Sequence, residues 1–106
     1  LGENLGDLGG LSIAYEAWKI SLEGKPVPAP AGGFTAEQRF FLSFGQIWRN
    51  LYRPEMERLQ ALTDVHSLPR LRVRGPLMNL PEFQQAFGCQ AGDPMVIAPE
   101  KRTEVW

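Results

Sequence analysis

Two acidic side chains near the start of the sequence have a spacing that could serve chemistry. Glu3 and Asp7 are four residues apart, so a helix would place both carboxylates on one face. Paired carboxylates favour a functional role only weakly. Acidic residues in the first turn of a helix often do no more than stabilise its dipole, and that alternative stays open.

The only histidine and a nearby arginine form a second pair of candidates. His66 is expected in a turn after a long helix, and Arg72 follows six residues later. An imidazole and a guanidinium could together be directed at a carbonyl or an oxyanion. The alternative is a solvated loop histidine and a surface arginine, which is the usual state of such residues. Cys89 has no charge cluster near it, so we interpret it as a small buried apolar residue.

The composition of this 106-residue chain limits what it can do alone. One cysteine cannot form an internal disulfide, and one histidine cannot complete a metal site that needs two histidine ligands. The net charge of −1 disfavours nucleic-acid binding, including a binder that would use Arg70, Arg72 and Arg74. No apolar run approaches the roughly 20 residues that cross a bilayer. The chain begins at Leu1 without a signal-peptide pattern, so we expect it to start within a longer polypeptide.

The spacing of apolar residues predicts a mainly α chain, and its elements must position the candidates. Four glycines near the start of the first helix each cost about 1 kcal/mol relative to alanine, so we expect close packing against a neighbour to hold it. The predicted elements in the first part of the chain are a helix over about 1–23, a proline- and glycine-rich connection over 24–34 and a long helix over about 35–63. The long helix begins with a capping box at Thr35 and kinks or restarts near Pro54. After it we predict a short extended segment over 70–74, a short helix over about 80–87 and an irregular tail over 88–106.

Local signals set the boundaries in the second half of the chain. Basic and apolar residues alternate over 70–74, which predicts the extended segment, and Gly75-Pro76 should end it. Asn79 is the expected N-terminal cap of the short helix, and Gly88 is its expected stop.

A set of short motifs follows one another along the whole chain. They include Glu3-Asn4-Leu5-Gly6-Asp7, Ala14-Tyr15, Tyr52-Arg53-Pro54-Glu55, Asp64-Val65-His66-Ser67, Arg72-Val73-Arg74-Gly75, Ala86-Phe87-Gly88-Cys89 and Val105-Trp106. In this order they resemble the C-terminal stretch of the neprilysin and endothelin-converting-enzyme family of zinc metallopeptidases. The resemblance implies the C-terminal helical portion of a zincin-type catalytic domain, in a metalloendopeptidase that cuts peptides before hydrophobic residues.

The resemblance also implies roles for the four polar candidates. Glu3 matches the family's glutamate zinc ligand, and Asp7 matches the aspartate that orients a zinc-bound histidine. His66 matches the histidine that stabilises the oxyanion, and Arg72 matches the arginine that holds a substrate carbonyl. The family's HExxH helix is absent from this chain, so the other two zinc ligands should come from elsewhere and the chain alone should be inactive.

Other residues refine what the resemblance implies. Ile47 and Trp48 match part of the apolar pocket for the side chain after the scissile bond. Thr103 stands where animal members carry cysteine, which points to a bacterial-type member. Family members typically work outside the cytoplasm, and the implied partners are a peptide substrate and the remainder of the catalytic domain.

A non-catalytic role is the competing hypothesis. The apolar helices, the missing second histidine and the net charge near zero also fit a helical protein-interaction module. Apolar faces that include Leu11, Trp18, Phe41 and Trp48 should be exposed in the separate chain, so we expect it to self-associate. Zinc content and a peptidase assay of the 106 residues distinguish the two hypotheses.

Overall fold

Five α-helices make up most of the chain. The computed structural model describes residues 2–105, so Leu1 and Trp106, which belong to the predicted first helix and the last motif, lie outside the described residues. The helices are α1 (Gly2–Ser21), α2 (Ala36–Ile47), α3 (Pro54–Thr63), α4 (Pro69–Asn79) and α5 (Pro81–Phe87), and a short 3₁₀ helix follows at Pro99–Lys101. No strand occurs over 2–105, where the pairing of Ala31 with Phe34 is an isolated bridge. The mainly α prediction is confirmed.

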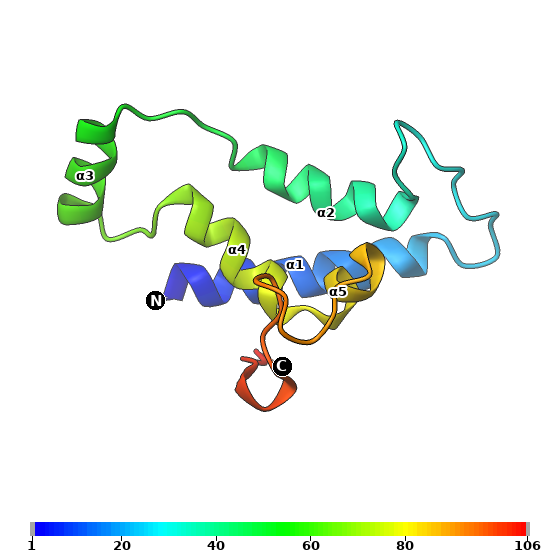
Figure 1. Cartoon of the computed structure of the whole chain (residues 1–106). Coiled ribbons are helices and arrows are strands. Elements are labelled where there is room, and N and C mark those ends of the chain that lie inside the picture. Colours follow the sequence, from blue (N-terminus) through cyan, green and yellow to red (C-terminus); the bar gives the residue numbers. More distant parts are fainter. Residues whose placement is uncertain (1, 106) are drawn as a thin grey trace.

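The core forms among α1, α2, α4 and α5, with α1 packed mainly on α4 (Figure 1). Leu8, Leu11 and Tyr15 recur at spacings of three and four residues and are buried on one face of α1. Phe41 of α2 is 1% exposed and stacks on Tyr15, with ring centroids 5.3 Å apart. Leu77 from α4 completes this part of the core. The packing fixes α1 against α4, which is the contact that the candidate site uses.

The predicted helix over 35–63 is divided into two helices, and of the two outcomes predicted at Pro54, a kink or a restart, the structure has the restart. Helix α2 ends at Ile47, residues 48–53 are irregular, and α3 begins at Pro54. Proline disfavours helical geometry in the residue before it, and Arg53 accordingly is extended (φ −70°, ψ 147°). Proline is well suited to the first position of a helix, so Pro54 starts α3 instead of kinking one long helix. Figure 1 shows α3 standing apart from the other helices, and none of its residues is buried.

The predicted extended segment over 70–74 is helical in the structure. Pro69 occupies the start of α4, and Gly75-Pro76, the expected stop, lies inside it. Four residues of α4 face the interior at helical spacing: Pro69, Val73, Pro76 and Leu77. This longer helical pattern outweighs the alternation of basic and apolar residues over 70–74. Pro76 cannot donate a hydrogen bond to the preceding turn, but it is buried within a helix that packs on α1.

The connection from α4 to α5 is tighter than the sequence suggested. Asn79 is the last residue of α4 and not the cap of α5, because Leu80 takes the cap position and Pro81 begins the helix. The predicted helix over 80–87 corresponds to α5. Gly88 follows it in the left-handed region (φ 64°), a conformation that glycine adopts without strain.

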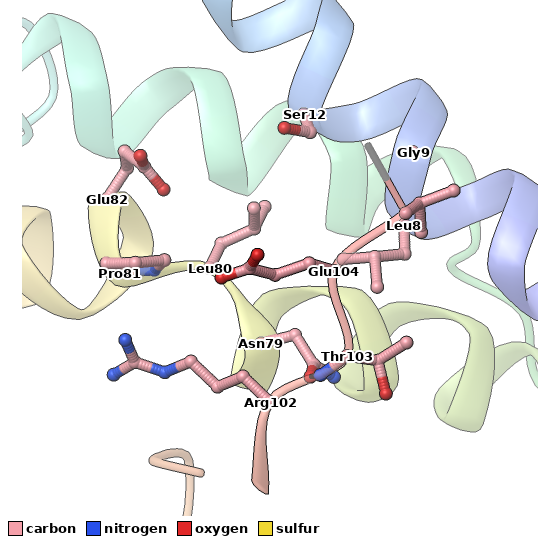
Figure 2. Close-up of a pocket in the computed structure, with 11 residues that line it drawn as sticks. Leu8, Gly9, Ser12, Asn79, Leu80, Pro81, Glu82, Arg102, Thr103 and Glu104 are labelled. Atoms are coloured by element: carbon pink, nitrogen blue, oxygen red, sulfur yellow. Dashed lines mark hydrogen bonds between the residues drawn. The ribbon is translucent and has the colours of Figure 1, made fainter. Parts of the chain in front are cut away.

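The C-terminal segment returns to the start of α1. Figure 2 shows residues 102–104 passing between Leu8 of α1 and the α4–α5 junction. The Thr103 backbone N–H donates to Asn79 Oδ1 at 2.8 Å, and Arg102 Nη2 donates to Gln84 Oε1 at 2.7 Å. These bonds leave a pocket of about 210 Å³, whose lining includes Glu82 and Glu104.

Three of the four glycines of α1 lie on its open side, whereas Gly9 is buried. A Cβ atom built on Gly2, Gly6 or Gly10 would have no described atom within 4 Å, so the expected close packing is not found at these positions within residues 2–105. Among the helices that the structure describes, none is long and apolar enough to cross a bilayer.

Candidate active site

Arg72 joins the two helices that carry the polar candidates. Its Nε and Nη2 atoms donate to the two carboxylate oxygens of Asp7 at 2.6 and 2.8 Å, and Nη2 also donates to Glu3 Oε2 at 3.3 Å. The side chains of Arg72 and Asp7 are 13% and 12% exposed, whereas Glu3 is 57% exposed. A bidentate ion pair between Arg72 and Asp7 thereby holds the first turn of α4 against the first two turns of α1.

The surroundings of Arg72 stabilise the protonated, positively charged form of its guanidinium. Hydrogen bonds to Asp7 raise the pKa of Arg72 above its usual value, and the nearby Glu3 carboxylate acts in the same direction, while desolvation opposes them. The guanidinium also lies over the Trp48 ring, 4.2 Å from its centroid. Trp48 thus supports one face of the planar cation.

His66 approaches the same carboxylates from the turn between α3 and α4. Its Nε2 atom is 4.0 Å from Glu3 Oε1, and its Nδ1 atom is 2.8 Å from Asp64 Oδ1. The His66 backbone N–H donates to the same Asp64 oxygen at 2.9 Å. These two bonds lower the pKa of the Asp64 carboxyl below its usual value. Asp64 therefore holds one ring nitrogen, and the other faces Glu3.

A direct contact fixes the histidine turn to α1. Asn4 Nδ2 donates to Ser67 Oγ at 2.9 Å, a bond between residues 63 positions apart in the chain. Asn4 Oδ1 is buried and has no hydrogen-bond partner among the described residues. Asn4 continues the stripe of Leu8, Leu11 and Tyr15 toward the helix start, so a polar residue occupies a position of the buried face.

The structure thus brings together five of the six site residues that the sequence predicted. Glu3, Asp7, His66, Arg72 and Trp48 lie in one cluster. Ile47 stands beside Trp48 at the end of α2 but is 76% exposed. Trp48 also lines an apolar groove of about 520 Å³ between α2, α4 and α5.

Three residues of the cluster were missed by sequence reasoning. Asp64, Asn4 and Ser67 all belong to quoted motifs, but no role was predicted for them. The spacing of Asp64 and His66 was the available signal, because an aspartate often accepts a bond from the backbone N–H two residues later. The contact between Asn4 and Ser67 depends on the packing of α4 on α1, for which the sequence offers no local signal.

The donor set determines what the cluster can bind. Within residues 2–105, no group of three or more histidine, cysteine, aspartate or glutamate side chains could hold a metal ion. Glu3 is the exposed carboxylate, and its oxygens keep unused acceptor capacity. The residues fit a site in which this chain contributes one carboxylate ligand and the others come from outside it.

Comparison with known proteins identifies the class. The family model described as peptidase family M13 matches residues 1–103. The chain belongs to this family, and the resemblance to neprilysin and endothelin-converting enzyme is confirmed.

Individual relatives match over the whole chain but only over a small part of their own length. Neprilysin-21 of Caenorhabditis elegans is 43% identical over 111 residues, which cover 100% of this chain and 14% of the relative. Endothelin-converting enzyme 1 of Mus musculus is 42% identical over 108 residues with the same two coverages. The cryo-EM structure of the Mycobacterium tuberculosis zinc metalloprotease Zmp1 in an open state matches with a TM-score of 0.90 at 41% identity, covering 99% of this chain and 16% of that one.

Proposed function

We propose that this chain is the C-terminal part of the catalytic domain of a zinc-dependent endopeptidase. Its Glu3 supplies one ligand of a single zinc ion, and the other two ligands come from an HExxH helix elsewhere in the polypeptide. The observation that carries the proposal is the convergence of Glu3, Asp7, His66 and Arg72 on one surface of a chain that belongs to family M13.

The roles of the two carboxylates differ in accordance with their burial. Glu3 projects from the open end of α1 and is the carboxylate available to an ion. Asp7 is nearly buried and tied to Arg72 through both oxygens. A carboxylate has about four acceptor positions, so Asp7 can still accept a hydrogen bond from a ligand histidine and fix its orientation. The zinc ion, when bound, activates a water molecule and polarises the peptide carbonyl.

His66 and Arg72 are the proposed donors to the substrate. Asp64 binds Nδ1 of His66, and the protonated imidazole can then donate from Nε2 as well. We assign that second N–H to stabilising negative charge on the carbonyl oxygen that is attacked. Arg72 has a rigid fork of donors, and we assign it to the carbonyl beyond the scissile bond.

The substrate class follows from the apolar side of the cluster. We propose cleavage of peptides on the amino side of hydrophobic residues, with Trp48 and Ile47 forming part of the pocket for that side chain. The apolar groove lined by Trp48 supports the assignment of Trp48, whereas Ile47 does not line that groove. The chain spans 14% of the length of the relatives described above, so the remainder of the catalytic domain is the main proposed partner. We place the whole protein outside the cytoplasm, as family members typically are.

The test is the substitution Glu3→Gln in the full-length polypeptide that carries this chain. Glutamine keeps the size of the side chain but removes the anionic ligand, so bound zinc per molecule and peptide hydrolysis should fall together. The matched control is Glu16→Gln, also on α1, at an exposed glutamate (55%) whose ion-pair partner is Lys19. Glu16→Gln should retain both zinc and activity.

Two results would contradict the proposal. Full zinc content and full activity in Glu3→Gln would remove Glu3 from the metal site. Tight stoichiometric zinc binding and peptide cleavage by the separate 106-residue chain would show that no outside ligands are needed.

A further inference from the structure

We propose that Asn4 is a positioning residue, which acts through Ser67 to hold the His66 imidazole at its distance from Glu3. The inference rests on the function proposed above, because it concerns the geometry of the same site. It assigns a role to an amide that touches neither the ion nor the substrate.

The geometry makes Asn4 the direct link between two parts of the site. Asn4 follows Glu3 immediately in α1, and Ser67 follows His66 immediately in the turn before α4. The hydrogen bond from Asn4 to Ser67 therefore joins the neighbours of the two groups that face each other across 4.0 Å. Apart from its 4.0 Å approach to Glu3, which is the distance to be held, His66 is bonded to Asp64, which belongs to the same turn and cannot fix that turn relative to α1.

Burial indicates that the amide serves position more than stability. Asn4 lies on the buried stripe of α1, where leucine would add apolar contact and has the higher helix propensity. Its Oδ1 atom is buried without a partner among residues 2–105, and leaving such an acceptor unpaired destabilises the folded state. Within the described residues, the side chain of Asn4 gains a single hydrogen bond, the one to Ser67.

The turn that carries His66 needs such a link. The His66 and Val65 side chains are exposed, and α3 before them has no buried residue. The buried anchors at Leu68 and Pro69 lie on the other side of Ser67. Without the bond to Asn4, the 64–67 segment would be tied to the core from one end only.

The experiment compares variants of the full-length polypeptide by kcat, KM, bound zinc and thermal midpoint. Asn4→Ala and Ser67→Ala should each lower kcat about 10–100-fold, the effect expected when a catalytic group is misplaced by about 1 Å. Zinc content and KM should be retained. The double variant should lose no more than either single variant, because both substitutions remove the same bond. Ser67→Thr keeps the hydroxyl and should retain kcat.

Controls separate positioning from simple destabilisation. Tyr15→Phe removes a buried hydrogen bond elsewhere on α1, so it should lower the thermal midpoint and leave kcat unchanged. A crystal structure of Asn4→Ala should show the 64–67 turn displaced from α1 while Glu3 stays in place.

The proposal is overturned by wild-type kcat in Asn4→Ala, by multiplicative losses in the double variant, or by an equal loss of kcat in Tyr15→Phe. Its failure is distinguishable from failure of the proposed function. Loss of zinc and activity in Glu3→Gln together with an unaffected Asn4→Ala rejects only the positioning role, whereas an unaffected Glu3→Gln rejects the function.

Discussion

Arg72 is the residue on which the geometry of the cluster depends most. It binds both oxygens of Asp7, reaches Glu3 and covers the Trp48 ring. A lysine would keep the charge but could neither bridge both oxygens nor stack on the ring as a plane. The shape of the guanidinium, and not its charge alone, therefore holds α4 on α1.

We predict that Arg72→Ala lowers the free energy of unfolding by about 3 kcal/mol, the lower end of the range for breaking a buried ion pair. The low end applies because both side chains keep slight solvent contact. Arg72→Lys should cost less, because the charge opposite Asp7 remains. Urea unfolding measures both. A loss below about 0.5 kcal/mol for Arg72→Ala, as for an ordinary surface substitution, would contradict the assigned role.

Tyr15 carries the other strong polar contact of α1. Its hydroxyl donates to Glu37 of α2, and the residue is 4% exposed. Burial raises the pKa of Tyr15 above its usual value, and the hydrogen bond to Glu37 raises it further. In the unfolded chain the Tyr15 hydroxyl ionises near pH 10, which is a lower pH than in the folded protein. The stabilisation that Tyr15 gives the folded state through this pKa difference is therefore complete below about pH 10. It is lost as the pH rises toward the pKa of Tyr15 in the folded state.

The expected result is a pH-dependent difference between the wild type and Tyr15→Phe. The wild type should be the more stable at pH 8, and its advantage should shrink as the pH rises from about 10 to 11. Tyr52→Phe removes the other phenolic hydroxyl, keeps Tyr15 and should preserve the alkaline loss. Denaturant unfolding across this pH range measures the difference, and a constant advantage at every pH would refute the linkage.

For individual residues, the order of motifs along the chain predicted which side chains form the cluster, but the local spacing of residues could not predict it. The separation of Glu3 and Asp7 by four positions correctly placed both on α1. The approach of His66 and Arg72 to them spans more than sixty positions, as the separations of 65 and 69 for the Arg72 bonds illustrate. Such contacts are fixed by packing of α4 on α1, and only the resemblance to whole enzymes could suggest them. The assigned roles stay predictions.

At the element scale, α4 shows how a short alternation misleads. Five residues that alternate between basic and apolar types fit a strand, but a helix also places residues of both types on several sides over so short a stretch. The longer pattern of Pro69, Val73, Pro76 and Leu77 is helical. Gly75-Pro76 was interpreted as a stop but lies inside α4, and three other prolines, Pro54, Pro69 and Pro81, each begin a helix.

A pair of glycine substitutions tests the helical accounts of α1 and α4. Gly10→Ala should stabilise the 106-residue chain by about 0.8–1 kcal/mol, because no described atom lies within 4 Å of the new methyl group. Gly75→Ala should gain less, although its surroundings are equally open, because the Pro76 ring restricts a helical residue with a Cβ before it. Thermal unfolding measures both, and an equal or larger gain for Gly75→Ala would contradict this explanation.

Across the whole molecule, several large apolar side chains are strongly exposed. Leu51, Leu62 and Val65, on or next to α3, are 97%, 85% and 89% exposed. Apolar patches of this kind mark surfaces that other protein covers. The expected exposure of Leu11 and Phe41 is wrong, because both are core residues (5% and 1% exposed). Self-association of the separate chain stays a prediction, now for the apolar residues around α3, which we expect to be covered in the full-length polypeptide. The predicted close packing of the α1 glycines also stays a prediction for that longer polypeptide.

We propose above that Glu3 binds a zinc ion whose other ligands lie outside this chain. A crystal structure of the zinc-loaded full-length polypeptide, with the metal located by its anomalous scattering, tests it most directly. A Glu3 carboxylate oxygen should lie about 2.0–2.2 Å from the zinc, with His66 and Arg72 facing the same cavity. A zinc ion coordinated entirely by other residues, with Glu3 directed into solvent, would contradict the account.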